Sequence, residues 1–225
     1  MVGASVIDDY VADLDSRLRG DRRTKVDLLT EARDSLHDAA ECYREAGFCE
    51  DTAQRKAISD FGPAGTIARS YQGELAAAYG ARTLRSILFM LPLVHLIWEG
   101  TRMLWYGPWE NFPGSPPPAW YYPFAQLNDS TNWAVAVAAA LALLGGRLMA
   151  RRVSDCRFIA RCAAGVALTA VGASILATGA LMVATIAFEP ARIYNSPPLF
   201  MASLVALAVL SRLAIMARRT ARFCV

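Results

Sequence analysis

The sequence contains few residues that could hold a metal ion. Its only histidines are His37 and His95, and its five cysteines show no C-x-x-C spacing. A structural zinc site needs about four well-spaced nitrogen or sulfur ligands, so we expect no metal site. The chain also lacks the motifs G-x-x-x-x-G-K-S/T, G-x-G-x-x-G, H-E-x-x-H and G-x-S-x-G. We therefore expect neither a cofactor nor an enzyme activity.

One long stretch has no charge at all. Residues 162–188 are 27 consecutive uncharged residues between Arg161 and Glu189. A helix of this length is about 40 Å long, which exceeds the roughly 30 Å hydrocarbon core of a bilayer. This stretch therefore predicts a transmembrane helix.

Three further apolar blocks cover residues 84–106, 133–149 and 199–216. Together with residues 162–188, they have lengths close to that of a spanning helix. We predict an all-α fold in which residues 81–225 form a four-helix transmembrane domain in a lipid bilayer.

The arginines near the ends of these blocks form two unequal groups. If residues 1–80 are cytoplasmic, two arginines, Arg102 and Arg192, fall on the outer side. Eleven fall on the cytoplasmic side: Arg82, Arg85, Arg147, Arg151, Arg152, Arg157, Arg161, Arg212, Arg218, Arg219 and Arg222. Because cytoplasmic loops are enriched in basic residues, we predict a multi-pass protein of the cell (inner or plasma) membrane with both termini in the cytoplasm. In that compartment the cysteines would be free thiols.

Residues 1–80 carry apolar side chains at helical spacing. One stripe contains Ile7, Tyr10, Val11, Leu14 and Leu18, and the next contains Leu29, Ala32, Leu36, Ala40 and Tyr43. Residues 51–54 have the form of an N-cap with Gln at the third helical position. Gly62-Pro63 ends a third helix and starts a fourth, which continues toward the first span with Gly73 and Gly80 as flexible points. We predict a cytoplasmic four-helix domain over residues 1–80.

The two halves of the chain have opposite charge. Residues 1–80 contain 15 acidic and 10 basic residues, whereas residues 81–225 contain 5 acidic and 13 basic residues. We expect the net charges of −5 and +8 to attract the N-terminal domain to the basic membrane face.

Three short segments within residues 5–78 resemble the HAAS domain, also called the permease prefix domain. They are EARDSLHDA at 31–39, AGF at 46–48 and AISDFGP at 57–63, which includes the turn Phe61-Gly62-Pro63. The sequence departs from the family pattern at Ser35, which stands at the usual histidine position, and at Pro63, which directly follows Gly62. The resemblance implies a regulatory or signalling module on a bacterial membrane protein, often associated with a PadR-type transcriptional regulator or fused to transporter permease domains.

The expected function is to relay a signal between the membrane and a cytoplasmic protein partner, such as a PadR-type regulator, without direct contact with nucleic acid. The alternative is a permease subunit or accessory component of a transporter, with an ATPase as the cytoplasmic partner. A third hypothesis is a structural membrane scaffold.

Two groups of residues in the predicted spans are candidate sites. His95, Glu99 and Arg102 lie at i, i+4 and i+7, on one helix face at membrane depth. They could form a structural Glu–Arg pair or a sensing or ion site. Gly165, Thr169, Gly172 and Gly179 form a stripe of small residues for helix packing, against another span or against a second copy in a homo-oligomer.

The segment between the first two spans, residues 107–132, combines aromatic residues with several prolines. We predict an interfacial loop without a long helix, because proline interrupts helices. The alternative hypothesis is an aromatic lid that senses a ligand.

Overall fold

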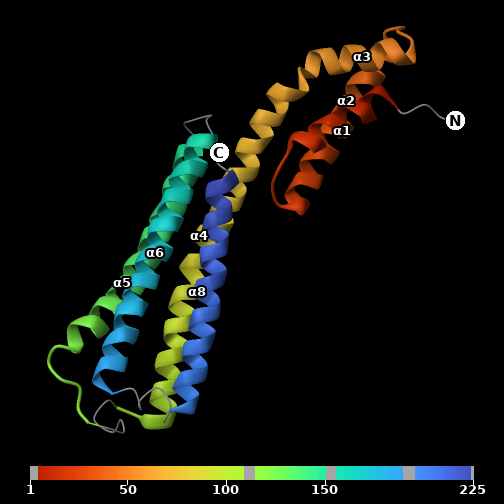
Figure 1. Cartoon of the computed structure of the whole chain (residues 1–225). Helices are drawn as coiled ribbons and strands as arrows, with labels where there is room; N and C mark the ends of the chain where they lie inside the picture. The colour runs from red at the N-terminus through yellow and green to blue at the C-terminus, as the bar shows by residue number, and fades with distance from the viewer. Residues whose placement is uncertain (1–4, 109–114, 151–155, 190–195, 224–225) are drawn as a thin grey trace.

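The computed structural model describes residues 5–108, 115–150, 156–189 and 196–223. These residues form seven α-helices, and no strand occurs among them (Figure 1). The predicted all-α class is therefore confirmed for the described part of the chain. A small group of N-terminal helices lies at one end of a bundle of four long helices (Figure 1).

The N-terminal helices are α1 (Val6–Arg17), α2 (Arg22–Glu45) and α3 (Glu50–Phe61). Together with the first turns of α4 (Ala64–Tyr106) they enclose one apolar core. The core contains Ile7, Val11, Leu14, Leu18, Leu29, Leu36, Ala40, Ala57, Ala68 and Leu75. We call residues 5–75 the N-terminal unit. Its buried positions include most of the two apolar stripes that the helical spacing predicts.

The start of α3 differs from the predicted cap. Its N-cap residue is Cys49, so the helix begins at Glu50 and Gln54 lies further inside it. The Gln54 side chain is almost fully buried and binds the start of α1 instead. Its Oε1 accepts hydrogen bonds from the Val6 amide (3.1 Å) and the Ser5 hydroxyl (3.0 Å), which satisfies one of the free amides at that helix end.

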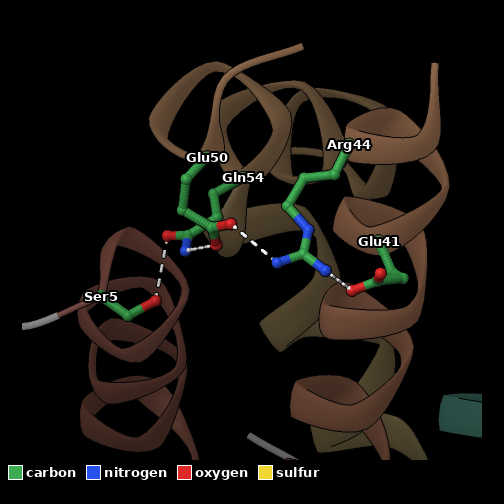
Figure 2. A network of polar contacts seen from close by, with 5 residues as sticks. All are labelled: Ser5, Glu41, Arg44, Glu50 and Gln54. Atoms are coloured by element: carbon green, nitrogen blue, oxygen red, sulfur yellow. Dashed lines mark hydrogen bonds and ion pairs between the residues drawn. The ribbon is translucent and has the colours of Figure 1, made fainter. Parts of the chain in front are cut away.

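Gln54 is also part of a polar network that joins α1, α2 and α3 (Figure 2). Its Nε2 donates to Glu50 Oε1 (2.6 Å), and Arg44 Nη1 donates to Glu50 Oε2 (3.3 Å). Arg44 also forms an ion pair with Glu41. The hydrogen bond from Gln54, followed by that from Arg44, lowers the pKa of Glu50 from its ordinary value. The network therefore holds Glu50 in its charged form.

Helix α4 belongs to both parts of the molecule. It has 43 residues without a break, which corresponds to about 65 Å at 1.5 Å per residue. Its first turns are attached to the segment between α1 and α2 by Gln72, which bonds the backbone of Arg19 twice. The Arg19 amide donates to Gln72 Oε1 (2.9 Å), and Gln72 Nε2 donates to the Arg19 carbonyl (2.8 Å).

Four helices are long and apolar enough to cross a membrane: α4, α5 (Tyr122–Ala150), α6 (Cys156–Phe188) and α8 (Pro197–Phe223). They correspond to the four predicted spans, but the helices are longer than the apolar blocks. In particular, α5 begins at Tyr122 rather than near Trp133. Residues 122–132 are thus helical where we predicted a loop. Pro123 is compatible with this because it lies in the first turn, where its missing N–H has no helical acceptor.

Within the bundle, α4 and α6 each pack against the other three long helices. The core between them contains Leu84, Ile87, Leu91, Ala167 and Leu213, among other residues. Large apolar side chains also cover the outside of the bundle; Leu104, Leu176 and Leu207 are 87%, 75% and 62% exposed. Such an apolar exterior is the surface that lipid tails would cover.

Helix α4 lies close to α6 at Gly80. A Cβ atom added there would lie 3.0 Å from the Cβ of Ala163, which is too close for an ordinary contact. A side chain at this position would force the two helices apart.

We expect Gly80→Ala to destabilise the bundle by about 1–3 kcal/mol, the usual cost of overpacking a core. Gly100→Ala is the matched control, because it lies in the same helix with no atom of the described residues within 4 Å of an added Cβ. Thermal unfolding of both variants in lipid nanodiscs should show a lower midpoint for Gly80→Ala only. Equal midpoints would mean that the Gly80 contact contributes nothing to stability.

Candidate functional site

The polar residues of the first span lie at the distal end of the bundle, where α4 ends at Tyr106 and α5 begins at Tyr122. Arg102 has a side chain that is only 3% exposed. Its Nε donates to Glu99 Oε2 (2.9 Å), and its Nη2 contacts the other Glu99 oxygen. Its Nη1 donates to the Gly107 carbonyl (2.5 Å). Arg102 thus neutralises Glu99 and also binds the chain where it leaves α4.

The end of α4 depends on Gly107. Its φ angle is +71°, in a region that side-chain-bearing residues rarely adopt, and its amide bonds the Met103 carbonyl (3.0 Å). The Arg102 guanidinium near the carbonyl end of α4 is also favourable for the helix dipole. The Glu99–Arg102 pair therefore terminates the helix as well as balancing charge.

The described contacts of the His95 side chain are with a different helix. Its side chain faces α5, where Nδ1 lies 3.8 Å from Asp129 Oδ1 and the ring meets Trp133 edge-to-face at 6.0 Å. A separation of 3.8 Å is too long for a hydrogen bond, so the Asp129 contact is electrostatic and depends on protonation of the histidine. The structure thus brings Glu99 and Arg102 together and places His95 in a different contact.

Further polar residues join α5 to α6 near the same end. Thr178 Oγ1 donates to Asn128 Oδ1 (3.1 Å), and the Tyr121 and Thr185 hydroxyls lie 3.0 Å apart. The prediction from sequence did not include these residues, because it placed the start of the second span at Trp133. Extension of the helical pattern back through Asn128 would have brought five polar residues, Asn128 and Asp129 among them, into the span.

At the other end of the bundle, Thr83 of α4 and Thr220 of α8 form a buried contact. Both side chains are fully buried and their hydroxyl oxygens are 2.9 Å apart. Thr83 Oγ1 also lies 3.0 Å from the Tyr79 carbonyl and Thr220 Oγ1 lies 2.9 Å from the Met216 carbonyl, so one hydroxyl donates to its own helix while the other donates across the pair. Hydroxyl pairs of this kind hold membrane helices together with modest energy.

The glycine stripe of α6 does not face another described helix. Atoms of the described residues stay more than 4 Å from a Cβ added at Gly165, Gly172 or Gly179, and Thr169 is exposed. The Thr169 hydroxyl bonds its own helix, at the Gly165 carbonyl (2.9 Å). The face that α6 buries is the opposite one and consists mainly of alanines: Ala160, Ala163, Ala164, Ala167, Ala170 and Ala177.

The turn Phe61-Gly62-Pro63 connects α3 to α4. Gly62 has φ +109° and forms the C-cap of α3, while Pro63 is the N-cap residue of α4, just before its first turn. Tyr10 of α1 fixes the turn: its hydroxyl donates to the Gly62 carbonyl (2.8 Å), and its ring meets Phe61 edge-to-face at 6.1 Å. The turn thus orients α4 relative to the N-terminal unit.

The described cysteines are free thiols. Cys42, Cys49 and Cys162 are exposed and Cys156 is partly exposed, whereas Cys224 lies outside the described residues. No group of three or more His, Cys, Asp or Glu side chains able to hold a metal ion occurs in the described ranges.

Neither a family model, nor a curated protein, nor a solved structure matches this chain.

Proposed function

We propose that this chain is a multi-pass protein of the cell membrane that relays a signal from its bundle to a cytoplasmic protein through its N-terminal unit. The observation that carries the proposal is the position of α4 in two cores. It contributes Ala68 and Leu75 to the N-terminal core, and Leu84, Ile87 and Leu91 to the bundle core. A displacement of α4 within the bundle would therefore move residues of the N-terminal core.

The distribution of arginines supports the proposed orientation. Arg82, Arg85, Arg157 and Arg161 lie toward the end of the bundle that carries the N-terminal unit, and Arg102 lies at the distal end. By the preference of basic residues for the cytoplasmic side, the N-terminal unit and the C-terminus would face the cytoplasm. The distal polar residues would then lie toward the outer face, where a stimulus could act on them.

The resemblance of residues 5–78 to the HAAS domain suggests the class of partner. On this proposal the N-terminal unit binds a cytoplasmic regulator of the PadR type, and the chain itself does not contact nucleic acid. The permease component with a partner ATPase is the competing function.

The orientation can be tested with the exposed thiols Cys42 and Cys49. In intact cells a membrane-impermeant maleimide should leave both unlabelled, and permeabilisation should allow labelling. Ser115→Cys, in a chain whose native cysteines are replaced by serine, is the matched control at the distal end and should react in intact cells. The reverse pattern would contradict the proposed orientation.

The partner can be tested with the same variants in the native membrane. A thiol-to-amine crosslinker attached at Cys42 should capture a cytoplasmic protein that the Ser115→Cys variant does not capture. A transcriptional regulator would support the relay, and an ATPase subunit would support the permease component instead. An identical set of products from both positions would contradict a specific role of the N-terminal unit.

A further inference from the structure

A histidine and an aspartate face each other between α4 and α5, in the distal half of the bundle. His95 Nδ1 and Asp129 Oδ1 are 3.8 Å apart, and Trp133 of α5 meets the imidazole edge-to-face at 6.0 Å. The His95 side chain is 20% exposed, whereas that of Asp129 is 57% exposed. The imidazole is thus largely covered, and the carboxylate that it faces is open to the surroundings.

The charge of this pair depends on pH. Histidine is the side chain whose charge ordinarily changes between about pH 5 and 8, while aspartate ordinarily stays ionised over that range. A neutral imidazole at 3.8 Å gains little from the carboxylate, but an imidazolium is attracted to it. An approach of about 1 Å would then form a charge-assisted hydrogen bond. Protonation therefore draws α4 and α5 together at this point.

The other charged groups near His95 on its own helix cancel each other. Glu99 lies one turn further along α4 and is paired with Arg102, whose Nε donates to Glu99 Oε2 (2.9 Å). Because a carboxylate and a guanidinium in contact have no net charge, this pair changes the charge balance at His95 little.

The three helices that pack against α4 supply few charges. Helix α5 carries Asp129 and, at its opposite end, Arg147. Helix α6 has no charged side chain over residues 162–188, and α8 has none over residues 197–211. In the described ranges, Asp129 is therefore the charged group of these helices that lies within salt-bridge distance of His95.

The depth of Asp129 gives protons from water access to the contact. Asp129 precedes the apolar block of α5, which begins at Trp133, by four residues, or about 6 Å along the helix. Headgroup layers extend about 5–8 Å beyond each side of the hydrocarbon core. Asp129 is therefore at the depth of the hydrated headgroups, and tryptophan is a residue typical of that boundary.

The contact also lies where α4 can move relative to its neighbours. Asn128, next to Asp129, accepts a hydrogen bond from Thr178 of α6 (3.1 Å), so α5 is attached to α6 at the same level. A change in the His95–Asp129 distance would therefore move α4 relative to both helices. From this contact α4 continues to the N-terminal core, to which it contributes Leu75.

We propose that His95 and Asp129 form a proton-responsive contact, in which acidification on the distal side draws α4 toward α5. The proton comes from water and adds to the imidazole, so no other reactant is needed. The role of this contact as a stimulus rests on the proposed relay through α4, whereas the pH dependence of the contact itself does not.

The first test is the thermal unfolding midpoint of the full-length chain in phosphatidylcholine nanodiscs between about pH 8 and pH 5. The attraction is present while His95 is protonated and is lost as the pH rises, so it adds stability at the acidic end. From pH 8 to pH 5, the midpoint of the wild type should rise by about 2–4 °C relative to that of His95→Gln. This comparison removes the titration of all groups that the two chains share.

Two further variants identify the partner. Asp129→Asn removes the carboxylate without altering the covered imidazole, and its midpoint should depend on pH as that of His95→Gln does. His37→Gln, which removes the exposed histidine of α2, is the matched control and should behave as the wild type does. The same pH dependence in the wild type and His95→Gln, or wild-type behaviour of Asp129→Asn, overturns the proposal. A loss in His37→Gln would assign the effect to the N-terminal unit and overturn it as well.

A separate readout distinguishes the contact from the relay. Spin labels on Cys42 and on a Ser115→Cys variant, in a chain whose other cysteines are replaced, report how the N-terminal unit lies relative to the distal end. A label distance that changes with pH in the wild type but not in His95→Gln supports both the contact and the relay. A pH-dependent unfolding midpoint with a constant label distance supports the contact and contradicts the relay.

Discussion

An Ala78→Pro substitution should loosen the attachment of the N-terminal unit to the bundle while the chain stays inserted in the membrane. Ala78 lies between Leu75, in the N-terminal core, and Gly80, at the contact with α6. Proline at this position would remove the hydrogen bond to the Glu74 carbonyl and clash with that carbonyl, at a cost of about 3 kcal/mol or more. Because the Ala78 side chain is exposed, the effect falls on the continuity of α4 and leaves the cores unchanged.

The change can be measured as a distance between spin labels. One label is placed on Cys42 and the other on a Ser115→Cys variant, in a chain whose other cysteines are replaced. The wild-type helix should give one narrow distance distribution, and Ala78→Pro a broad one. Ala78→Ser, which keeps the backbone N–H, is the control. A narrow distribution in the proline variant would show that an uninterrupted α4 is not needed to hold the N-terminal unit.

Replacing Arg102 with leucine should be the most destabilising single change at the distal end. It would leave the Glu99 carboxylate and the Gly107 carbonyl without the guanidinium that binds both. Breaking a buried ion pair costs about 3–5 kcal/mol, and we expect the lower value because the Glu99 side chain is 40% exposed. Thermal unfolding in nanodiscs at neutral pH is the measurement.

Two further variants distinguish the loss of the ion pair from the general effect of removing an arginine. Arg85→Leu removes an exposed arginine of the same helix and should have a small effect. The double variant Glu99→Gln/Arg102→Leu should recover part of the lost stability, because no unpaired carboxylate remains. If Glu99→Gln gives no recovery, the contribution of Arg102 comes mainly from its bond to Gly107.

The four long helices could be predicted from the sequence because a helix that crosses the hydrocarbon layer needs a long, predominantly apolar run. The ends of these helices could not be predicted, since hydropathy identifies only the segment within the apolar layer of the membrane. Each helix continues beyond that segment. Asp129 in α5 and Arg157 in α6 lie in such extensions. The first of these extensions contains Asp129, which lies near His95, and the second contains Arg157, which donates to the Arg69 carbonyl.

The contacts between helices also could not be predicted from local sequence patterns. His95 and Glu99 share a helix face, but the neighbour of His95 depends on where α5 packs. In α6 the seven-residue spacing of glycines is as clear in the sequence as the spacing of alanines. The structure buries Ala163, Ala167 and Ala170 and leaves Gly165 and Gly179 outward, so a stripe of small residues does not by itself identify the packed face.

The bond from Arg157 to the Arg69 carbonyl gives the N-terminal unit a second point of support on the bundle. If α4 were its sole connection to the bundle, the N-terminal unit would follow only the rotation and axial sliding of that helix. Because α6 also contacts the N-terminal unit near Gly73, a tilt between α4 and α6 would pivot about the close contact of Gly80 with Ala163. A small tilt between α4 and α6 within the bundle would then change the distance between Arg69 and Arg157 on the other side of this contact.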